Sequence, residues 1–515
     1  GGVTTIVTDH RWRVTDKTGW RHDVPRRGWA LAGVECFDSD QAPDGWRTPE
    51  FDDCDWAMAE EHAHFKPGWE GVYLATGLPG LKHKFEPCFL HAGPFLFENA
   101  PSAYRDDAPP QEWGLALSGV ERQQAPCVKI EQLSVETGGF SLSGLNGRRN
   151  IAVAFDLLSE MTGSLIFKLE CQSGGVIDIG WSERLGAEGW PQIVQKNGTY
   201  ADRFIARAGI NEWFPINFSA GRYVMLMLYG FKGRVSFERL GMVAGEPDLP
   251  WRASFTSNDP LLNGIWELCE RTQRVGTQEG LMDCPTREQA TYAGDGNPTA
   301  EWIGRLTGDH GYWRRLLEET FAVQGQDGLV KTQTFSGMRY VLLDYDLLSV
   351  IGVRNYLRET GDVTFVRGLL PAARRVLGWF EGHLNREGLF DYPSEAMPGE
   401  APWVNCPARA GDALCDPGLM IFIDHPGTGW HNIGEPGIER KGLNAAINAL
   451  LALAYRAMAE LCDATGDDAG AIRYCDHADR IAAAGACFWS VQAGYFVDGI
   501  VGGCQSAQVS QQTNT

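Results

Sequence analysis

The chain has 515 residues, more than one hydrophobic core usually holds, so its length predicts two to four domains. Its hydrophobic content of 43% and charged content of 22% exclude a disordered chain. The net charge of -21 repels nucleic acid and anionic lipid, so neither is an expected partner and a neutral ligand is favoured. No run of about 18 apolar residues predicts a membrane span.

The first half of the chain is predicted to be β-rich. Short apolar runs alternate there with Gly, Asp, Asn and Pro, which is the spacing of antiparallel strands and turns. Period-two alternation in residues 149–155, 164–170 and 175–180 predicts strands with one buried and one wet face. We expect two jelly-roll-like β-sandwich modules, over residues 1–135 and 136–250.

The second half is predicted to be helical, starting where Ser257-Asn258-Asp259-Pro260 supplies capping residues and an early proline. Apolar spacing predicts seven amphipathic segments: 257–276, 297–306, 309–323, 343–359, 362–386, 440–463 and 466–489. Paired helices with sizeable loops suggest an all-α (α/α)6 toroid over residues 251–515. Six hairpins need twelve helices, and residues 506–515 look like the cap and first turn of another, so we expect a truncated toroid with exposed apolar faces on its first and last helices.

The densest group of chemically useful residues follows the first predicted helix. It is the run Asp283-Cys284-Pro285-Thr286-Arg287-Glu288, followed by Gly294-Asp295. Pro285 forbids a regular helix through the run, so the charged groups are expected on a loop, where sites are often built. Glycoside hydrolysis needs one carboxylic acid that protonates the departing oxygen and a second carboxylate. The alternative is a surface turn in which Arg287 pairs with Glu288 or Asp295.

This run resembles the catalytic signature of glycoside hydrolase family 78, the α-L-rhamnosidases of the six-hairpin glycosidase clan. The similarity extends over nearly the whole chain. Upstream it includes Gly45-Trp46, Phe51-Asp52-Asp53-x-Asp55-Trp56, Phe155-Asp156, Gly163, Glu183, Trp213-Phe214-Pro215 and Phe218-x-x-Gly221-Arg222-Tyr223. Downstream it includes Asp344-Tyr345-x-Leu347-Leu348, Tyr356, Thr360-Gly361-Asp362, Phe422-Ile423-Asp424, Asn444 and Ser510-Gln511-x-x-Asn514.

The resemblance implies an inverting glycosidase that removes terminal α-L-rhamnose from glycosides or polysaccharides, with Glu288 as the general acid. The residues that it implies as substrate ligands are Asp283, Arg287, Tyr292, Asp295, Asp344, His425 and Trp430. It implies no cofactor and no metal, and a rhamnosylated carbohydrate as the partner. The family's general base is a Glu late in the barrel, which we expect beyond residue 515. Candidates inside the chain are Glu395, Glu435 and Glu439, on an irregular, proline-rich segment.

The chain also departs from the family. Tyr292 stands where the family commonly has Trp, residues 289–291 differ from its usual Lys-Leu-Gly, and His425 replaces a Trp of many relatives. A six-hairpin glycosidase or lyase acting on another sugar, or a non-catalytic carbohydrate-binding protein, therefore stays an alternative. His62-x-His64 beside Glu60 could suggest a metal site, but a wet sandwich loop explains it, because no third ligand with metal spacing follows.

Thirteen cysteines without a Cys-x-x-Cys pair are interpreted as buried free thiols. Free thiols favour a reducing compartment, and no signal peptide is visible, so the cytoplasm is expected rather than secretion. The P-loop, the Gly-x-Ser-x-Gly elbow and the His-Glu-x-x-His motif are absent from the sequence, which leaves nucleotide, esterase and zinc-protease functions without support. The sequence does not predict an oligomeric state.

Overall fold

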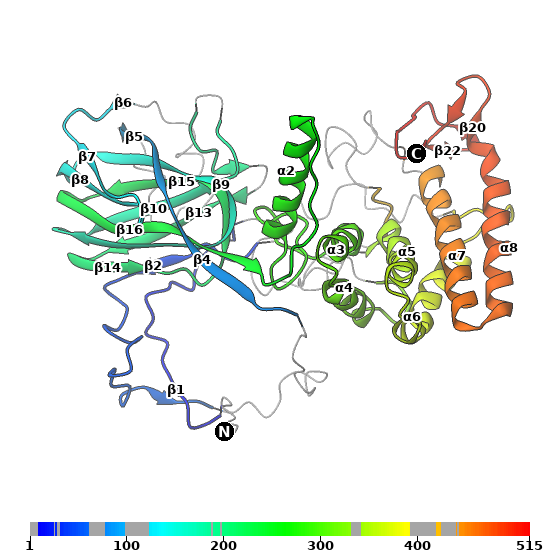
Figure 1. Ribbon diagram of the computed structural model, residues 1–515, viewed down its shortest axis with the longest axis horizontal. Helices are drawn as coiled ribbons and strands as arrows, with labels where there is room; N and C mark the ends of the chain where they lie inside the picture. Colours follow the sequence, from blue (N-terminus) through cyan, green and yellow to red (C-terminus); the bar gives the residue numbers. More distant parts are fainter. Residues whose placement is uncertain are drawn as a thin grey trace. The chain divides into compact units, whose positions relative to one another are not determined.

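The computed structural model describes residues 9–24, 26–27, 31–60, 78–97, 123–186, 189–195, 198–330, 341–391, 419–423, 439 and 442–514. It divides into two compact units. The β-rich unit takes most of the chain up to Glu246 together with Pro285–Arg287, and the helical unit takes Pro247–Cys284 and Glu288–Thr515 (Figure 1). The predicted change from strands to helices near residue 257 is therefore confirmed.

The described residues of the β-rich unit form a sheet of twelve strands in the order β2-β13-β10-β15-β9-β16-β8-β7, joined by β4, β5, β6 and β14. The strands are β2 Cys36–Asp38, β4 Leu81–Pro87, β5 Phe89–Phe97, β6 Gln123–Gln124, β7 Lys129–Ser134, β8 Gly139–Asn146, β9 Asn150–Cys171, β10 Gly175–Ser182, β13 Ala201–Ala206, β14 Gly209–Trp213, β15 Ser219–Tyr229 and β16 Lys232–Pro247. Two short pairs lie outside it: β1 Arg13–Val14 with β3 Ala57–Met58, and β11 Val194–Gln195 with β12 Gly198–Thr199.

The long strand β9 belongs to both layers of a β-sandwich. Its first part pairs with β5 and β15, and its second part pairs with β14 and β16. The crossing occurs at Gly163, where a Cβ atom would lie 2.1 Å from the Val243 carbonyl oxygen. Rings from the two layers meet in the core, such as Phe167 and Phe204 at 5.1 Å between centroids. The predicted sandwich is confirmed, but the strands expected at 149–155 and 164–170 are two ends of one strand.

The predicted boundary between residues 1–135 and 136–250 falls inside this sheet system. β4 pairs with β16, β5 pairs with β9, and β7 pairs antiparallel with β8. Strands on both sides of residue 135 therefore share one hydrogen-bonded sheet. The division of the chain into three domains stays a prediction.

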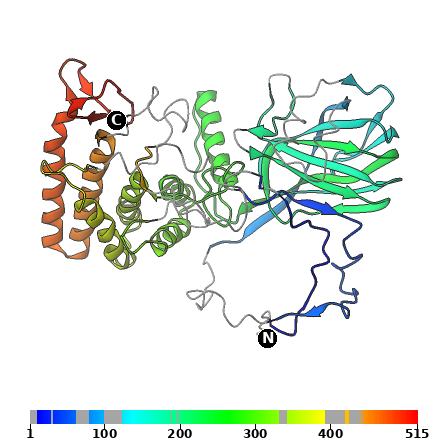
Figure 2. The ribbon, with the colours of Figure 1, turned by 180° about the vertical axis from the view of Figure 1, so that it is seen from behind.

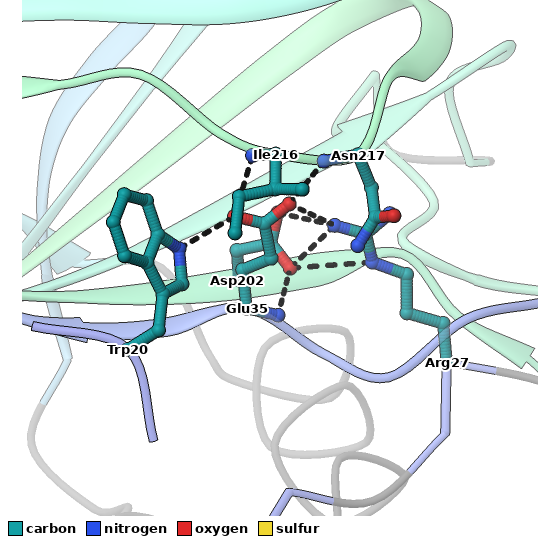
Figure 3. A network of polar contacts seen from close by, with 6 residues as sticks. All are labelled: Trp20, Arg27, Glu35, Asp202, Ile216 and Asn217. Atoms are coloured by element: carbon teal, nitrogen blue, oxygen red, sulfur yellow. Dashed lines mark hydrogen bonds and ion pairs between the residues drawn. The ribbon is translucent and has the colours of Figure 1, made fainter. Parts of the chain in front are cut away.

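A buried ionic network holds the start of the chain on this sheet. β2 pairs parallel with β13, and Arg27 donates to both carboxylate oxygens of Asp202, with Nη2 2.8 and 2.7 Å from them. The Asp202 carboxylate also accepts the Glu35 backbone N–H, and the Glu35 carboxylate accepts the Trp20 indole N–H (Figure 3). Arg27, Glu35 and Asp202 are each at most 4% exposed, so the three charges lie in the interior.

The helical unit confirms all seven predicted helices. They are α2 Pro260–Gly276, α3 Ala293–Thr307, α4 Gly311–Ala322, α5 Leu343–Thr360, α6 Val363–Glu381, α7 Ala445–Thr465 and α8 Asp468–Ala484. The helices pack as pairs, α3 with α4, α5 with α6 and α7 with α8, and the first members also contact each other in the order α3, α5, α7 (Figures 1 and 2). Two layers of paired helices are the packing expected for consecutive hairpins of an α/α toroid.

Helix α2 differs from the other helices because Val275 is its one fully buried residue. Its apolar residues include Leu261 and Leu268, which are 69% and 68% exposed. This agrees with the exposed apolar face expected on the first helix.

Helix α7 is long and apolar enough to cross a membrane, but 67% of its most apolar window is buried inside the protein. Core helices of soluble proteins pass the same test, so this is weak evidence for a membrane span.

Short strands accompany the helices. They are β17 Val341–Leu342, β18 Leu419–Met420, β19 Leu443–Asn444, β20 Trp489–Ser490, β21 Tyr495–Phe496, β22 Gly499–Val501 and β23 Cys504–Gln505, with the 3₁₀ turn η2 Gly485–Phe488.

At the predicted helix start in residues 506–515, Ser510 Oγ accepts the Thr513 backbone N–H, as a helix cap does, and Asp498 accepts the Ser510 backbone N–H. Residues 511–513 form a turn.

Candidate active site

The loop between α2 and α3 closes on itself. The Asp283 backbone N–H donates to the Ala290 carbonyl oxygen at 2.9 Å, and Asp283 Oδ1 accepts the Ala290 N–H at 3.2 Å. Gln289 takes a φ of 53°, which turns the chain back and lets its N–H bond the Cys284 carbonyl oxygen at 3.1 Å. The intervening residues therefore form a closed loop that projects Glu288.

Asp283 and Glu288 lie together within this loop. Ligand atoms of Asp283, Cys284 and Glu288 are all within 4.8 Å of one another. Burial and the negative charge of Glu288 raise the pKa of the Asp283 carboxyl to about 7. Because the Cys284 thiol donates to Asp283 Oδ2 at 3.0 Å, we interpret the three groups as a hydrogen-bonded cluster rather than a metal centre. The Asp283 carboxyl can therefore hold a proton near neutral pH.

Two tyrosine hydroxyls bond the acidic side chains. Tyr292, the N-cap residue of α3, donates to Glu288 Oε2 at 2.5 Å. Tyr345, in the first turn of α5, donates to Asp295 Oδ2 at 2.9 Å. The Tyr345 ring lies against Gly294, where a Cβ atom would come within 2.5 Å of it. The Gly294-Asp295 pair of the sequence motif thus has a steric cause, since only glycine admits the ring.

Asp344 is placed as a structural anchor. It is 3% exposed, and its two carboxylate oxygens accept the backbone N–H groups of Phe422 and Ile423 at 2.9 and 3.0 Å. These bonds hold the segment that follows β18, whose strand pairs parallel with β17 just before α5. Direct binding of sugar by Asp344 stays a prediction, although both of its oxygens already have protein donors.

The remaining predicted residues divide between the units or lie outside the described residues. Within the β-rich unit, Thr286 Oγ1 donates to Glu183, and Arg287 groups with that unit. His425 and Trp430 lie outside the described residues, as do His62, His64, Glu395 and Glu435. Glu439 is described, and its backbone N–H and carbonyl oxygen bond Asp498 and Asn444. Its role as a base stays a prediction.

Comparison with known proteins gives a family match for part of the helical unit. Residues 251–402 match the model of the bacterial α-L-rhamnosidase six-hairpin glycosidase domain, a span that includes Asp283, Glu288 and Asp295. This part of the chain is therefore similar to the six-hairpin glycosidase domain of bacterial α-L-rhamnosidases. The match supports a glycosidase of the α-L-rhamnosidase type. A search of curated proteins found no match.

Solved structures show the same fold. The family 78 rhamnosidase of Bacillus sp. GL1 is 17% identical with a TM-score of 0.77, and the match covers 98% of this chain and 67% of that one. A rhamnosidase from Klebsiella oxytoca with rhamnose bound is 18% identical with a TM-score of 0.60, covering 84% and 75%. The α-L-rhamnosidase of Streptomyces avermitilis, complexed with L-rhamnose, is 16% identical with a TM-score of 0.59, covering 95% and 38%.

Two further residues at or next to the candidate site were not singled out from the sequence. Tyr345 was noted only as part of a motif, and its hydroxyl bond to Asp295 joins α3 to α5. Asp346, one residue further, is buried, and its Oδ1 accepts the Val330 N–H at 2.7 Å. Burial raises the pKa of Asp346 well above its usual range. The available signal was the clustering of Asp and Tyr in the first turn of a helix.

Asp283→Asn should change how the stability of this domain depends on pH. The pKa of Asp283 is raised to about 7 in the fold, against about 3.9 in an unfolded chain, so the folded parent holds a proton that the unfolded chain has lost. Parent stability therefore falls as pH rises from about 4 to 7, and the amide avoids this loss while Oδ1 still accepts the Ala290 N–H. The melting temperature of the variant minus that of the parent should increase over this range.

The control for this experiment is Asp259→Asn at the N-cap of α2, which also changes a carboxylate to an amide and can keep the cap. The melting temperature of Asp259→Asn minus that of the parent should not increase in this way between pH 4 and pH 7. A constant difference between Asp283→Asn and the parent from pH 4 to pH 8 would contradict the raised pKa of Asp283.

Proposed function

We propose that the protein hydrolyses terminal α-L-rhamnosides with inversion, using Glu288 as the general acid. The observation that carries this proposal is the closed loop that brings Glu288 beside Asp283 within the domain that matches the rhamnosidase family. Glu288 gives its proton to the glycosidic oxygen as the bond to the sugar breaks. A second carboxylate removes a proton from the attacking water on the opposite face of the ring.

The other acidic and basic groups suit a sugar ligand. A carboxylate or a guanidinium can hold two neighbouring hydroxyls at once, so we assign Asp283, Arg287 and Asp295 to the hydroxyls of the sugar at the cleaved bond. Rhamnose is bound in the Klebsiella structure and L-rhamnose in the Streptomyces structure, which supports rhamnose as the sugar here. The general base is proposed to be a glutamate. Glu395, Glu435 and Glu439 remain alternatives within the chain, and of these only Glu439 lies in the described residues.

The first test is hydrolysis of p-nitrophenyl α-L-rhamnoside beside other p-nitrophenyl glycosides, with the first sugar product observed by NMR. Selective release of β-L-rhamnose supports the sugar and the inverting mechanism together. Release of the α-anomer would overturn inversion, and activity on another glycoside alone would overturn the sugar. Sugar binding without turnover would identify a carbohydrate-binding protein.

We also propose a reducing compartment, with the cytoplasm as the location. None of the eleven cysteines in the described part of the chain forms a disulfide bond. Five of them are buried and six are exposed, so the interpretation as buried thiols is wrong for those six. Free thiols persist where glutathione and thioredoxin keep them reduced. Detection of the native protein in a secreted fraction would contradict this location.

A further inference from the structure

The two tyrosines that bond the acidic side chains also pack against each other. The rings of Tyr292 and Tyr345 meet edge to face, with centroids 6.3 Å apart and an interplanar angle of 86°. Tyr345 meets Phe422 in the same way at 5.7 Å, and Asp344 holds the Phe422 backbone. The hydroxyls of Tyr292 and Tyr345 are thus placed by a continuous aromatic row whose ring orientations are fixed by packing.

We propose that Tyr292 and Tyr345 are positioning residues, Tyr292 for the proton of Glu288 and Tyr345 for the carboxylate of Asp295. This inference rests on the proposed glycosidase function and adds the groups that orient its acid. It also gives Tyr292 a role other than direct substrate binding, because its hydroxyl donates to Glu288 at 2.5 Å.

The hydrogen bond from Tyr292 selects the oxygen that carries the proton. Because Oε2 of Glu288 accepts the phenol hydrogen, the transferable proton resides on Oε1. In the reaction the proton leaves Oε1 for the glycosidic oxygen, and that oxygen keeps the electron pair of the broken bond to the sugar. The glutamate becomes a carboxylate, and the phenol hydroxyl then stabilises the new charge with a charge-assisted hydrogen bond.

This arrangement has a signature in the pH profile. The alkaline limb reports loss of the proton from the general acid. A donor to the charged form favours that loss, so Tyr292→Phe should move the alkaline limb of kcat/KM up by about one pH unit and lower kcat. The titratable and charged groups near Glu288 in the described residues are Asp283, Cys284 and Tyr292, with Arg287 preceding it in the chain, and all except the phenol stay unchanged in this variant.

Two matched variants each remove the hydroxyl of a different tyrosine. Tyr345→Phe keeps the aromatic row but removes the hydroxyl bond to Asp295. KM should therefore rise about tenfold, while the alkaline limb of kcat/KM stays in place. Tyr312→Phe removes a buried hydroxyl that donates to the Gln278 carbonyl oxygen at 2.8 Å. Tyr312→Phe should lower the melting temperature but leave the alkaline limb of kcat/KM in place. An unmoved limb in Tyr292→Phe, or an equal shift in Tyr312→Phe, would overturn the inference.

A double-mutant cycle separates this inference from the proposed function. Tyr292→Phe should destabilise the parent more than it destabilises the Glu288→Ala protein, because the oxygen that accepts the Tyr292 hydroxyl is then missing. If the parent hydrolyses none of the glycosides, the proposed function is wrong. The double-mutant cycle then still tests whether the Tyr292 hydroxyl is bonded to Glu288. Equal destabilisation in both backgrounds would then overturn the positioning of Glu288 by Tyr292.

Discussion

Glu288→Gln should lower kcat by about 10² to 10⁴ on rhamnosides with poor leaving groups, because the departing oxygen then receives no proton in the transition state. The amide has nearly the same shape and can still accept the Tyr292 hydroxyl, so the loop should stay folded. With p-nitrophenolate as the leaving group the loss should be smaller, since that oxygen departs without much protonation. Steady-state kinetics on an alkyl and a nitrophenyl rhamnoside measure the difference.

Asp283→Asn is the matched control for the assignment of the acid. Asp283 lies beside Glu288 and has a pKa raised to about 7, so it is the other group that could hold the proton. If Asp283 binds sugar hydroxyls, the variant should lose activity equally on both leaving groups. A loss that depends on the leaving group in Asp283→Asn, and not in Glu288→Gln, would transfer the role of general acid to Asp283.

The sequence was informative where the physical cause is local. Helical spacing predicted all seven helices, and the start signal at Ser257 to Pro260 lies at the observed start of α2. The cap was expected from Ser or Asn, but the N-cap residue is Asp259. Pro285 predicted a loop, and the residues near it do form one. The run from Asp283 to Glu288 closes through bonds between near neighbours, so its compactness could be anticipated from the sequence.

Features that depend on distant partners were not predictable in this way. Two predicted strands are one strand, β9, because Gly163 lets the chain pass close to β16 and join both layers. The pairing of Tyr345 with Asp295 spans 50 residues, and alternation or helical spacing carries no information about it. Arg27 and Asp202 are 175 residues apart, and nothing in either local pattern indicates that they are buried together.

Arg27→Met should lower the free energy of unfolding of the β-rich unit by about 3–5 kcal/mol at neutral pH. The substitution leaves Asp202 without its cation in the interior, whereas Glu35 keeps donors from Trp20, Ile216 and Asn217 (Figure 3). Calorimetry should show the transition of this unit shifted to lower temperature. The Arg222–Asp156 pair also joins a guanidinium to both carboxylate oxygens but is less buried, so Arg222→Met is the control and should cost only about 1 kcal/mol.

The deficit caused by Arg27→Met should also depend on pH. Burial raises the pKa of Asp202 to about 6 even though Arg27 opposes it, and removing Arg27 must raise it further. The folded variant can therefore relieve the unpaired charge by taking up a proton at acidic pH, so its deficit should be small near pH 5 and largest near pH 8. Asp202→Asn in the same protein should restore part of the stability, because the amide oxygen can still accept the Glu35 N–H. If Arg27→Met and Arg222→Met lose equal stability at pH 5 and at pH 8, the buried ion pair does not anchor the start of the chain.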